Sequence, residues 1–359
     1  MTGATLRAAR QAAGLSLATM ARRTRYGKGY LSNVETGRRR ATPEVVLAYE
    51  RVLGDEMDRR GLLTGLAASL VAPTAVSELI RRGFVAALGR RDSRDEWLHR
   101  ADTYGQDYMV VGAGQLQQRL AGDLVVLQQQ LEDPVLWGVA ARLLTVYGKT
   151  TSDAREAARW YHLAVAAADR SEDKAVRVWV RGRAALALAY EGTGLSTART
   201  LAEQALAIGD TPDLGLLNAH MALAHVAVHR GDEVTAYKQL EQARRVFDRA
   251  GSYEQISDFA VPEWRMATFT SMLLSRMGDP AAVQAQDEAD RTRPKTLTRF
   301  ATHIQLHRAL MLVNSGDSSE GVALARAAWQ ALPPQRRSQS LSLMLDEIMR
   351  RAGVSTSRT

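Results

Sequence analysis

The stretch GLSLATMARRTRYGKGYLSNVETGRRR, from Gly14 to Arg40, predicts two short helices joined by a tight turn. Ser16 stands where its hydroxyl can cap the first helix by accepting a hydrogen bond from a free amide of the first turn. The turn falls around residues 24–27, where Gly27 and Gly29 are expected to loosen the backbone. Gly37 follows the second helix, where helices often end in a left-handed residue. Helical spacing gives the first helix one apolar side, made of Leu17, Met20 and Ala21.

The order G-L-S, then an alanine in the first helix, then L-S-x-V-E-x-G-R, resembles the Cro/repressor-type (XRE) helix-turn-helix family of bacterial DNA-binding domains over about residues 4–54. In that family the second helix lies in the major groove, with its first residues facing base edges. Glu35 matches the family's buried structural glutamate, and Leu17 stands where the family often has glutamine, so a polar contact usual there is not expected. The resemblance implies a DNA-binding surface of Ser16, Arg25, Lys28, Gly29, Tyr30, Ser32, Asn33, Arg38, Arg39 and Arg40.

The positive charge of the chain is concentrated in the same stretch. The 359 residues carry 47 Lys and Arg against 39 Asp and Glu, a net charge of +8. Residues 1–54 hold ten of the basic and three of the acidic residues, a net charge of +7, so the remainder is nearly neutral. Because neutralised phosphates drive binding to DNA, this asymmetry predicts a double-stranded DNA operator as the partner. A small helical bundle with an accidental basic face is the alternative.

The sequence predicts an all-α protein of more than one domain, because 359 residues exceed a single small domain. A five-helix helix-turn-helix domain is expected at residues 1–54 and a connecting helix or linker at 55–76. A tetratricopeptide-like helical solenoid is expected at 77–353, followed by a disordered tail at 354–359.

Residues 57–72 resemble a twin-arginine export signal, because Arg59 and Arg60 precede a short apolar run. The run lies behind a DNA-binding domain and is too short to span a bilayer, so a buried connecting helix is the favoured interpretation. The chain has no cysteine, which excludes disulfides and a thiol nucleophile and fits a reducing compartment. A cytoplasmic protein with no membrane partner is therefore expected.

Glycines recur through the second part of the chain at intervals of 37 to 47 residues. Two small residues often follow such a glycine seven positions apart, as Ala236 and Ala243 do. The pattern resembles tetratricopeptide repeats, whose first helix ends as Ala189-Tyr190-x-x-x-Gly194 does here. It predicts five helix pairs between about 134 and 335, preceded by two or three irregular helices over 77–131. An unspecific all-α bundle is the alternative. The repeat glycines are Gly148, Gly194, Gly231, Gly278 and Gly316.

Catalytic motifs are missing from the sequence, which has no Gly-rich phosphate loop, no G-x-S-x-G and no H-E-x-x-H. No catalytic residue, cofactor or metal is therefore predicted, and the chain is not expected to be an enzyme. The pairs His225/His229 and His303/His307 have the i, i+4 spacing of metal ligands, but a zinc site needs further ligands. Histidines that are exposed or hydrogen-bonded within the fold are the favoured interpretation.

A DNA-binding domain joined to a helical-repeat body resembles, in its arrangement, the bacterial peptide-sensing regulators. The resemblance implies a homodimeric transcriptional regulator whose body senses a signalling peptide or a small acidic ligand. A helical-repeat adaptor and a plasmid- or phage-type repressor with no effector are the alternatives. In tetratricopeptide pairs the first helix lines the concave groove. The groove positions counted from the repeat glycines, none of them acidic, are Arg142, Arg181, Asn218, His225, Arg265 and His303.

Overall fold

The computed structural model describes residues 6, 7, 10, 15–42, 44, 45, 48, 49, 52 and 92–354. Across these residues the regular structure is helical and contains no strand, which confirms the all-α prediction. The chain divides into two compact units, Met1–Ser77 and Glu78–Thr359, here called the head and the body. The predicted connecting helix at 55–76 and the tail at 355–359 lie outside the described residues.

The head contains the two predicted helices, α2 (Leu17–Thr24) and α3 (Lys28–Glu35). The Ser16 hydroxyl accepts a hydrogen bond from the Thr19 amide at 3.1 Å and caps α2, as predicted. Gly37 has a φ of 77° just past the end of α3, also as predicted. The turn between the helices differs from the prediction, because its left-handed residue is Arg25, with a φ of 60°. Gly27 and Gly29 have no positive φ, so the turn does not depend on their freedom.

A compact apolar core holds the head helices together. The Glu35 carboxylate is buried beside it and accepts hydrogen bonds from the Arg10 guanidinium at 2.7 and 2.8 Å and from the Tyr49 hydroxyl at 2.8 Å. These partners confirm the predicted structural role of Glu35, since a buried carboxylate needs a cation and hydrogen bonds to remain charged. The buried apolar residues of this core are Leu6, Leu15, Met20, Leu31, Val34, Val45, Tyr49 and Val52.

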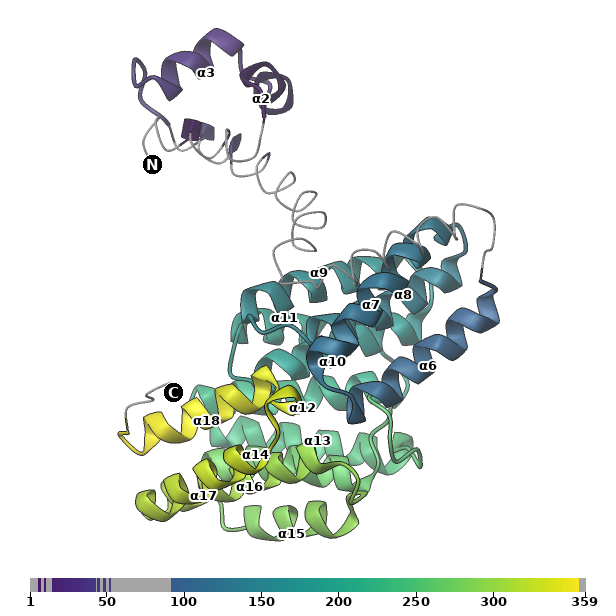
Figure 1. The fold of residues 1–359 in the computed structure, drawn as a ribbon, viewed down its shortest axis with the longest axis vertical. Helices are drawn as coiled ribbons and strands as arrows, with labels where there is room; N and C mark the ends of the chain where they lie inside the picture. The colour runs from purple at the N-terminus through teal and green to yellow at the C-terminus, as the bar shows by residue number, and fades with distance from the viewer. Residues whose placement is uncertain are drawn as a thin grey trace. The chain divides into compact units, whose positions relative to one another are not determined.

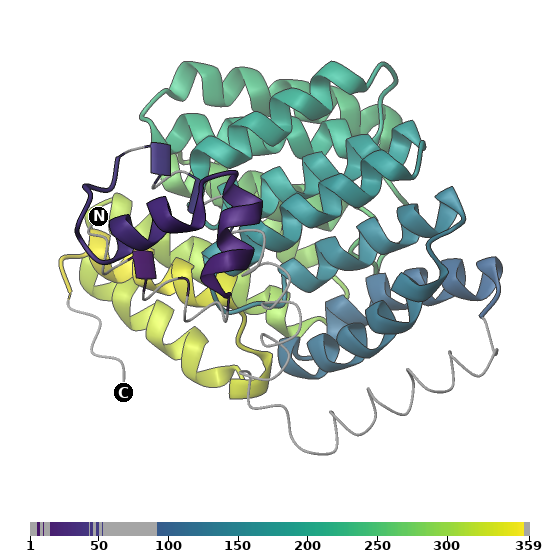
Figure 2. The same cartoon turned by 90° about the horizontal axis from the view of Figure 1, so that it is seen from above.

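The body is a succession of helices stacked side by side, which can be followed by colour in Figures 1 and 2. Its described residues begin with α6 (Arg94–Val110), α7 (Ala113–Leu127) and η1 (Gln128–Gln130), and they end with η2 (Pro334–Arg336) and α18 (Gln339–Arg351). Within residues 92–354, these elements enclose the five predicted helix pairs, packed in the manner of a solenoid. The pairs are α8 (Pro134–Gly148) with α9 (Ala154–Arg170), α10 (Lys174–Tyr190) with α11 (Leu195–Ile208), α12 (Leu214–His229) with α13 (Glu233–Ala250), α14 (Glu263–Met277) with α15 (Ala282–Thr292), and α16 (Thr298–Asn314) with α17 (Ser318–Ala331).

Local signals in the sequence set the boundaries of these helices. Aspartates start several of them, and each accepts a hydrogen bond from a backbone amide of the first turn. Four of the five repeat glycines adopt the left-handed backbone that the tight turns require, with φ between 53° and 101°. Gly148 instead ends α8, and a Cβ there would lie 2.7 Å from the Tyr161 ring. The capping aspartates are Asp133, Asp153, Asp173, Asp213 and Asp232.

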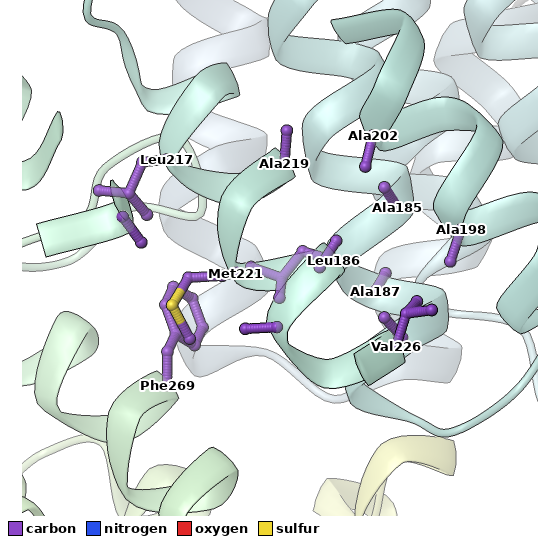
Figure 3. Packing of buried hydrophobic residues seen from close by; sticks show 14 of the residues in the cluster. Ala185, Leu186, Ala187, Ala198, Ala202, Leu217, Ala219, Met221, Val226 and Phe269 are labelled. Carbon is purple, nitrogen blue, oxygen red and sulfur yellow. The ribbon is translucent and has the colours of Figure 1, made fainter. Parts of the chain in front are cut away.

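Small residues allow the helices of the body to approach closely. Ala185 of α10 and Ala202 of α11 lie next to one another in the core (Figure 3). The backbones of α10 and α12 meet at Gly182 and Gly215, where a Cβ on Gly182 would come within 2.0 Å of the Gly215 carbonyl oxygen. Such contact excludes any side chain at this crossing. No helix in the described part of the chain is both long and apolar enough to cross a lipid bilayer.

The loop 251–262, between α13 and α14, leaves the helical stack and reaches back to its earlier helices. The Asp258 amide donates to the Gly105 carbonyl of α6 at 2.8 Å, and the Phe259 ring packs edge-on against Trp179 of α10. A Cβ at Gly105 would lie 2.7 Å from the Phe259 ring, so α6 and the loop are in direct contact. This loop therefore occupies the inner side of the stack between α6, α10 and α14.

Candidate functional site

The outward side of α3 is the candidate DNA-binding surface of the head. Leu31, Val34 and Glu35 face the core and are buried, which turns the other side of the helix outward. Lys28 and Gly29 are exposed, and Ser32 and Asn33 are partly exposed. All ten residues of the predicted surface are at least partly exposed. The helix can therefore present polar side chains to a groove without disturbing the core.

Tyr30 differs from the other residues of this surface because its ring packs against other side chains of the head. It stacks on Tyr26, with ring centroids 5.4 Å apart, and the Arg39 guanidinium lies 5.4 Å from its centroid. The Arg39 amide also donates to the Asn33 carbonyl at 2.9 Å, which fixes the chain after α3. Tyr30 thus positions Arg39 beside the start of the helix.

The arginines after Gly37 give the head its cationic edge. Arg38, Arg39 and Arg40 are exposed, and in the described residues none of them pairs with a carboxylate. Glu35 is the acidic residue of α3, and its charge is neutralised inside the head by Arg10. The positive field of the three arginines is therefore not cancelled by a neighbouring acid on this helix.

The body holds a second candidate site, a cavity of about 70 Å³ between helices far apart in the sequence. Its walls come from α6, α10, α14, α16 and the start of α18. They combine cations with aromatic and aliphatic side chains and one carboxylate, Glu191. The lining residues include Tyr108, Lys149, Arg183, Leu186, Ala187, Tyr190, Glu191, Arg265, Phe269, Arg299, Phe300 and His303.

Three cations of the cavity wall share one carboxylate oxygen. Oδ1 of Asp258, from the loop 251–262, accepts from Lys149 Nζ at 2.5 Å, from Arg183 at 2.9 Å and from Arg265 at 2.7 Å. Asp258 is completely buried, and its Oδ2 makes no hydrogen bond to the protein. The pKa of Asp258 is held well below its ordinary value because the attraction of these cations outweighs the cost of burial.

Arg299 adds a fourth cation to this wall without a carboxylate partner among the described residues. It donates to the Tyr108 carbonyl at 2.6 Å, and its guanidinium lies over the Tyr108 and Phe300 rings, 4.8 and 5.2 Å from their centroids. The Nε atoms of Arg183, Arg265 and Arg299 are buried and make no hydrogen bond to the protein. The cavity wall therefore carries more positive than negative charge.

The structure places only some of the predicted groove residues at the cavity. Arg265 and His303 line the cavity, whereas Arg142 lies over the Phe259 ring, with 5.9 Å between guanidinium and centroid. Arg181 pairs with Asp169 of α9, and its Nη2 donates to both carboxylate oxygens, at 2.9 and 2.8 Å. Asn218 and His225 are buried between helices and do not line the cavity.

Two carboxylates outside the predicted set also belong to this site, since Glu191 lines the cavity and Asp258 lies among its cations. The prediction also missed Lys149, Arg183 and Arg299. Arg183 was missed because the degenerate repeats left the helical register uncertain, and Lys149 because it follows the end of α8.

The two histidine pairs meet in the interior rather than at a metal site. His307 Nε2 lies 2.9 Å from the Tyr190 hydroxyl, and His225 Nδ1 lies 3.3 Å from Arg276. Burial lowers the pKa of His303 to about 3 and that of His229 to about 4, so both rings are neutral near pH 7. The described residues contain no group of three or more side chains suited to hold a metal ion.

Comparison with known proteins supports the head and leaves the body without a relative. A family model described as a helix-turn-helix domain matches residues 3–60. No curated protein and no solved structure matches the chain significantly. The match covers α2, α3 and the buried Glu35, so it supports a DNA-binding regulator through the same residues that form the candidate surface.

Proposed function

We propose that the protein is a sequence-specific transcriptional regulator of the XRE type, whose tetratricopeptide-like body forms a homodimer and binds an effector. The observation that carries the DNA-binding part is the helix-turn-helix match over residues 3–60, combined with an outward α3 face and three adjacent arginines that pair with no carboxylate among the described residues. Helix α3 enters the major groove, where Lys28, Ser32 and Asn33 contact base edges. Arg38, Arg39 and Arg40 bind phosphates.

The body supplies the effector response in this proposal, and no catalytic step is assigned to it. Support comes from the cavity, whose wall brings several buried cations together. An effector that binds better to one arrangement of the dimer shifts the spacing of the two heads and so changes operator affinity. An adaptor would not need a charged interior cavity of this kind.

The DNA-binding part is tested by incubating the full-length protein with fragmented genomic DNA of its source and sequencing what it retains. The expected result is a small set of fragments that share one motif. Binding to a duplex with that motif should weaken steeply as salt rises, because phosphate contacts release counterions. Retention of all fragments alike, or of none, would contradict the proposal.

A further inference from the structure

Part of the space between α6, α10 and α14 is filled by the chain itself. The loop 251–262 runs between α6, α10 and α14 and is fixed there by the Asp258 and Phe259 contacts. Arg299 of α16 also bonds to the Tyr108 carbonyl of α6, which brings the two ends of the helical stack together. What remains is a cavity of about 70 Å³. One water molecule needs about 10–15 Å³ of such space, so this cavity fits a group of only a few non-hydrogen atoms.

The charges around this cavity do not balance. Lys149, Arg183 and Arg265 face the single carboxylate of Asp258, and each of these four side chains is at most 8% exposed. Arg299 brings a fourth positive charge, and Glu191, the other carboxylate of the wall, is only partly charged near pH 7 because burial raises its pKa to about 7. A buried cation without a counter-charge is unfavourable, and its repulsion of other cations is strong where water is excluded. Part of the imbalance is relieved at Lys149, whose pKa is well below its ordinary value because of burial and the nearby Arg183.

The remaining wall is suited to the hydrocarbon part of a small molecule. Leu186 and Ala187 of α10, Phe269 of α14 and Phe300 of α16 line the same space as the cations. A carboxylate accepts two parallel hydrogen bonds from an arginine, and Arg183, Arg265 and Arg299 all line this space. A short organic acid would thus meet cations at one end and apolar side chains at the other.

We infer that this cavity binds the anion of a small organic acid, with its carboxylate beside Arg183, Arg265 and Arg299 and its short hydrocarbon part against Phe269 and Phe300. The biological role of the bound acid rests on the proposed function, because the acid would be the effector of the regulator. Binding itself requires only the body. Because the anion restores a counter-charge, it stabilises the folded chain, and the stability gained reports its binding.

The experiment measures the thermal unfolding of the full-length protein with rising concentrations of three probes, each compared with sodium chloride at equal ionic strength. Propionate is the small acid, propionamide is its neutral counterpart of the same shape, and inorganic phosphate tests for any compact anion. Propionate should raise Tm in a saturable manner, and propionamide should not. Saturable binding of phosphate but not of propionate would assign the cavity to phosphate compounds and overturn the assignment to an organic acid.

Two variants of the cavity wall test whether the effect arises there. Arg299→Met removes a cation that has no carboxylate partner in the described residues, and Ala187→Leu fills the cavity without changing its charge. Both should lose the propionate response. Arg293→Met is the matched control, because Arg293 is a buried arginine paired with Asp290 outside the cavity. It should lower Tm and keep the response. An equal response in all four proteins, or none with the unmutated protein, would overturn the inference.

Operator binding is measured separately, so the two proposals can fail independently. If propionate binds but no DNA sequence is preferred, the assignment of the cavity to an organic acid is supported, and the proposed function as a transcriptional regulator is contradicted. If the operator is bound but propionate has no effect on Tm, the proposed regulator function is supported, and the organic-acid site is contradicted.

Discussion

Glu191 is a carboxylic acid at the cavity whose charge changes near neutral pH. Burial raises its pKa from 4.5 to about 7, although Lys149 and Arg183 nearby favour the charged form. The hydroxyls of Tyr161 and Tyr190 also lie within electrostatic range of it. Because the folded chain holds this proton more tightly than the unfolded chain does, stability contributed by Glu191 is lost as pH rises from about 4.5 to about 7.

Glu191→Gln should therefore become more stable than the unmutated protein as pH rises through this window, by about 1–3 kcal/mol at pH 8, because the buried charge is removed. Urea unfolding at pH 5 and pH 8 measures the difference. Glu203→Gln is the control, since Glu203 pairs with Arg199 on the exposed side of α11 and should change little at either pH. A constant difference between Glu191→Gln and the unmutated protein at both pH values would contradict the assignment.

Glu35 plays the corresponding part in the head, where burial opposes its charge but the hydrogen bonds from Arg10 and Tyr49 keep its pKa below the ordinary value. Glu35→Gln leaves Arg10 buried without a counter-charge, which should destabilise the head by about 3–5 kcal/mol. All six tryptophans lie in the body, so their fluorescence reports on the body alone. Circular dichroism should therefore show an early loss of helix that tryptophan fluorescence does not follow. Coincident transitions in the two signals would count against separate folding of the head.

At the scale of elements, α3 and the arginines after it should contact different parts of the DNA, α3 the bases and the arginines the phosphates. Asn33→Ala should weaken operator binding by about 1–3 kcal/mol at one base position, because Asn33 lies on the outward face of α3. Arg39→Ala should weaken binding to all sequences alike and reduce the salt dependence by about one phosphate contact. Binding titrations against a set of single-base operator variants separate the two patterns. Identical profiles for both variants would contradict the division of roles.

The helices of the body were predictable from sequence because their ends follow local rules. A tight turn needs a left-handed residue, so the glycines at 194, 231, 278 and 316 mark the turns wherever they fall in the fold. The same reasoning failed at Gly27 and Gly29, where Arg25 takes the left-handed position instead. A glycine permits this conformation but does not require it.

Most of the cavity was not predictable, because its parts come together only when the stack closes. Of the predicted groove residues, Arg265 and His303 line it. Lys149, Arg183, Arg265 and Arg299 come from four places along the chain, and Asp258 lies in a loop outside the repeat pattern. Uncertainty in the helical register also limits the prediction of which side chains line the cavity. Two residues along a helix turn the side chain by about 200°, so choosing position 181 instead of 183 selects the opposite side of α10.

At the scale of the whole molecule, the proposed function requires two heads. One head presents a single recognition helix of eight residues, too little surface for tight and selective binding by itself. A symmetric dimer places two such helices on two half-sites, and joining them raises the affinity without any new contact. Because the head is small, we expect the body to hold the two copies together.

The full-length protein should therefore have twice the mass of one chain in light scattering at micromolar concentration. Its footprint on the operator should cover two inverted half-sites whose centres are about 10 base pairs, or one helical turn, apart or a multiple of it. Inserting five base pairs between the half-sites turns one to the opposite face of the duplex and should abolish cooperative binding, whereas inserting ten should restore part of it. A monomeric mass together with a footprint over one half-site would show that the head acts alone, and an effector could then not work by changing the spacing of two heads.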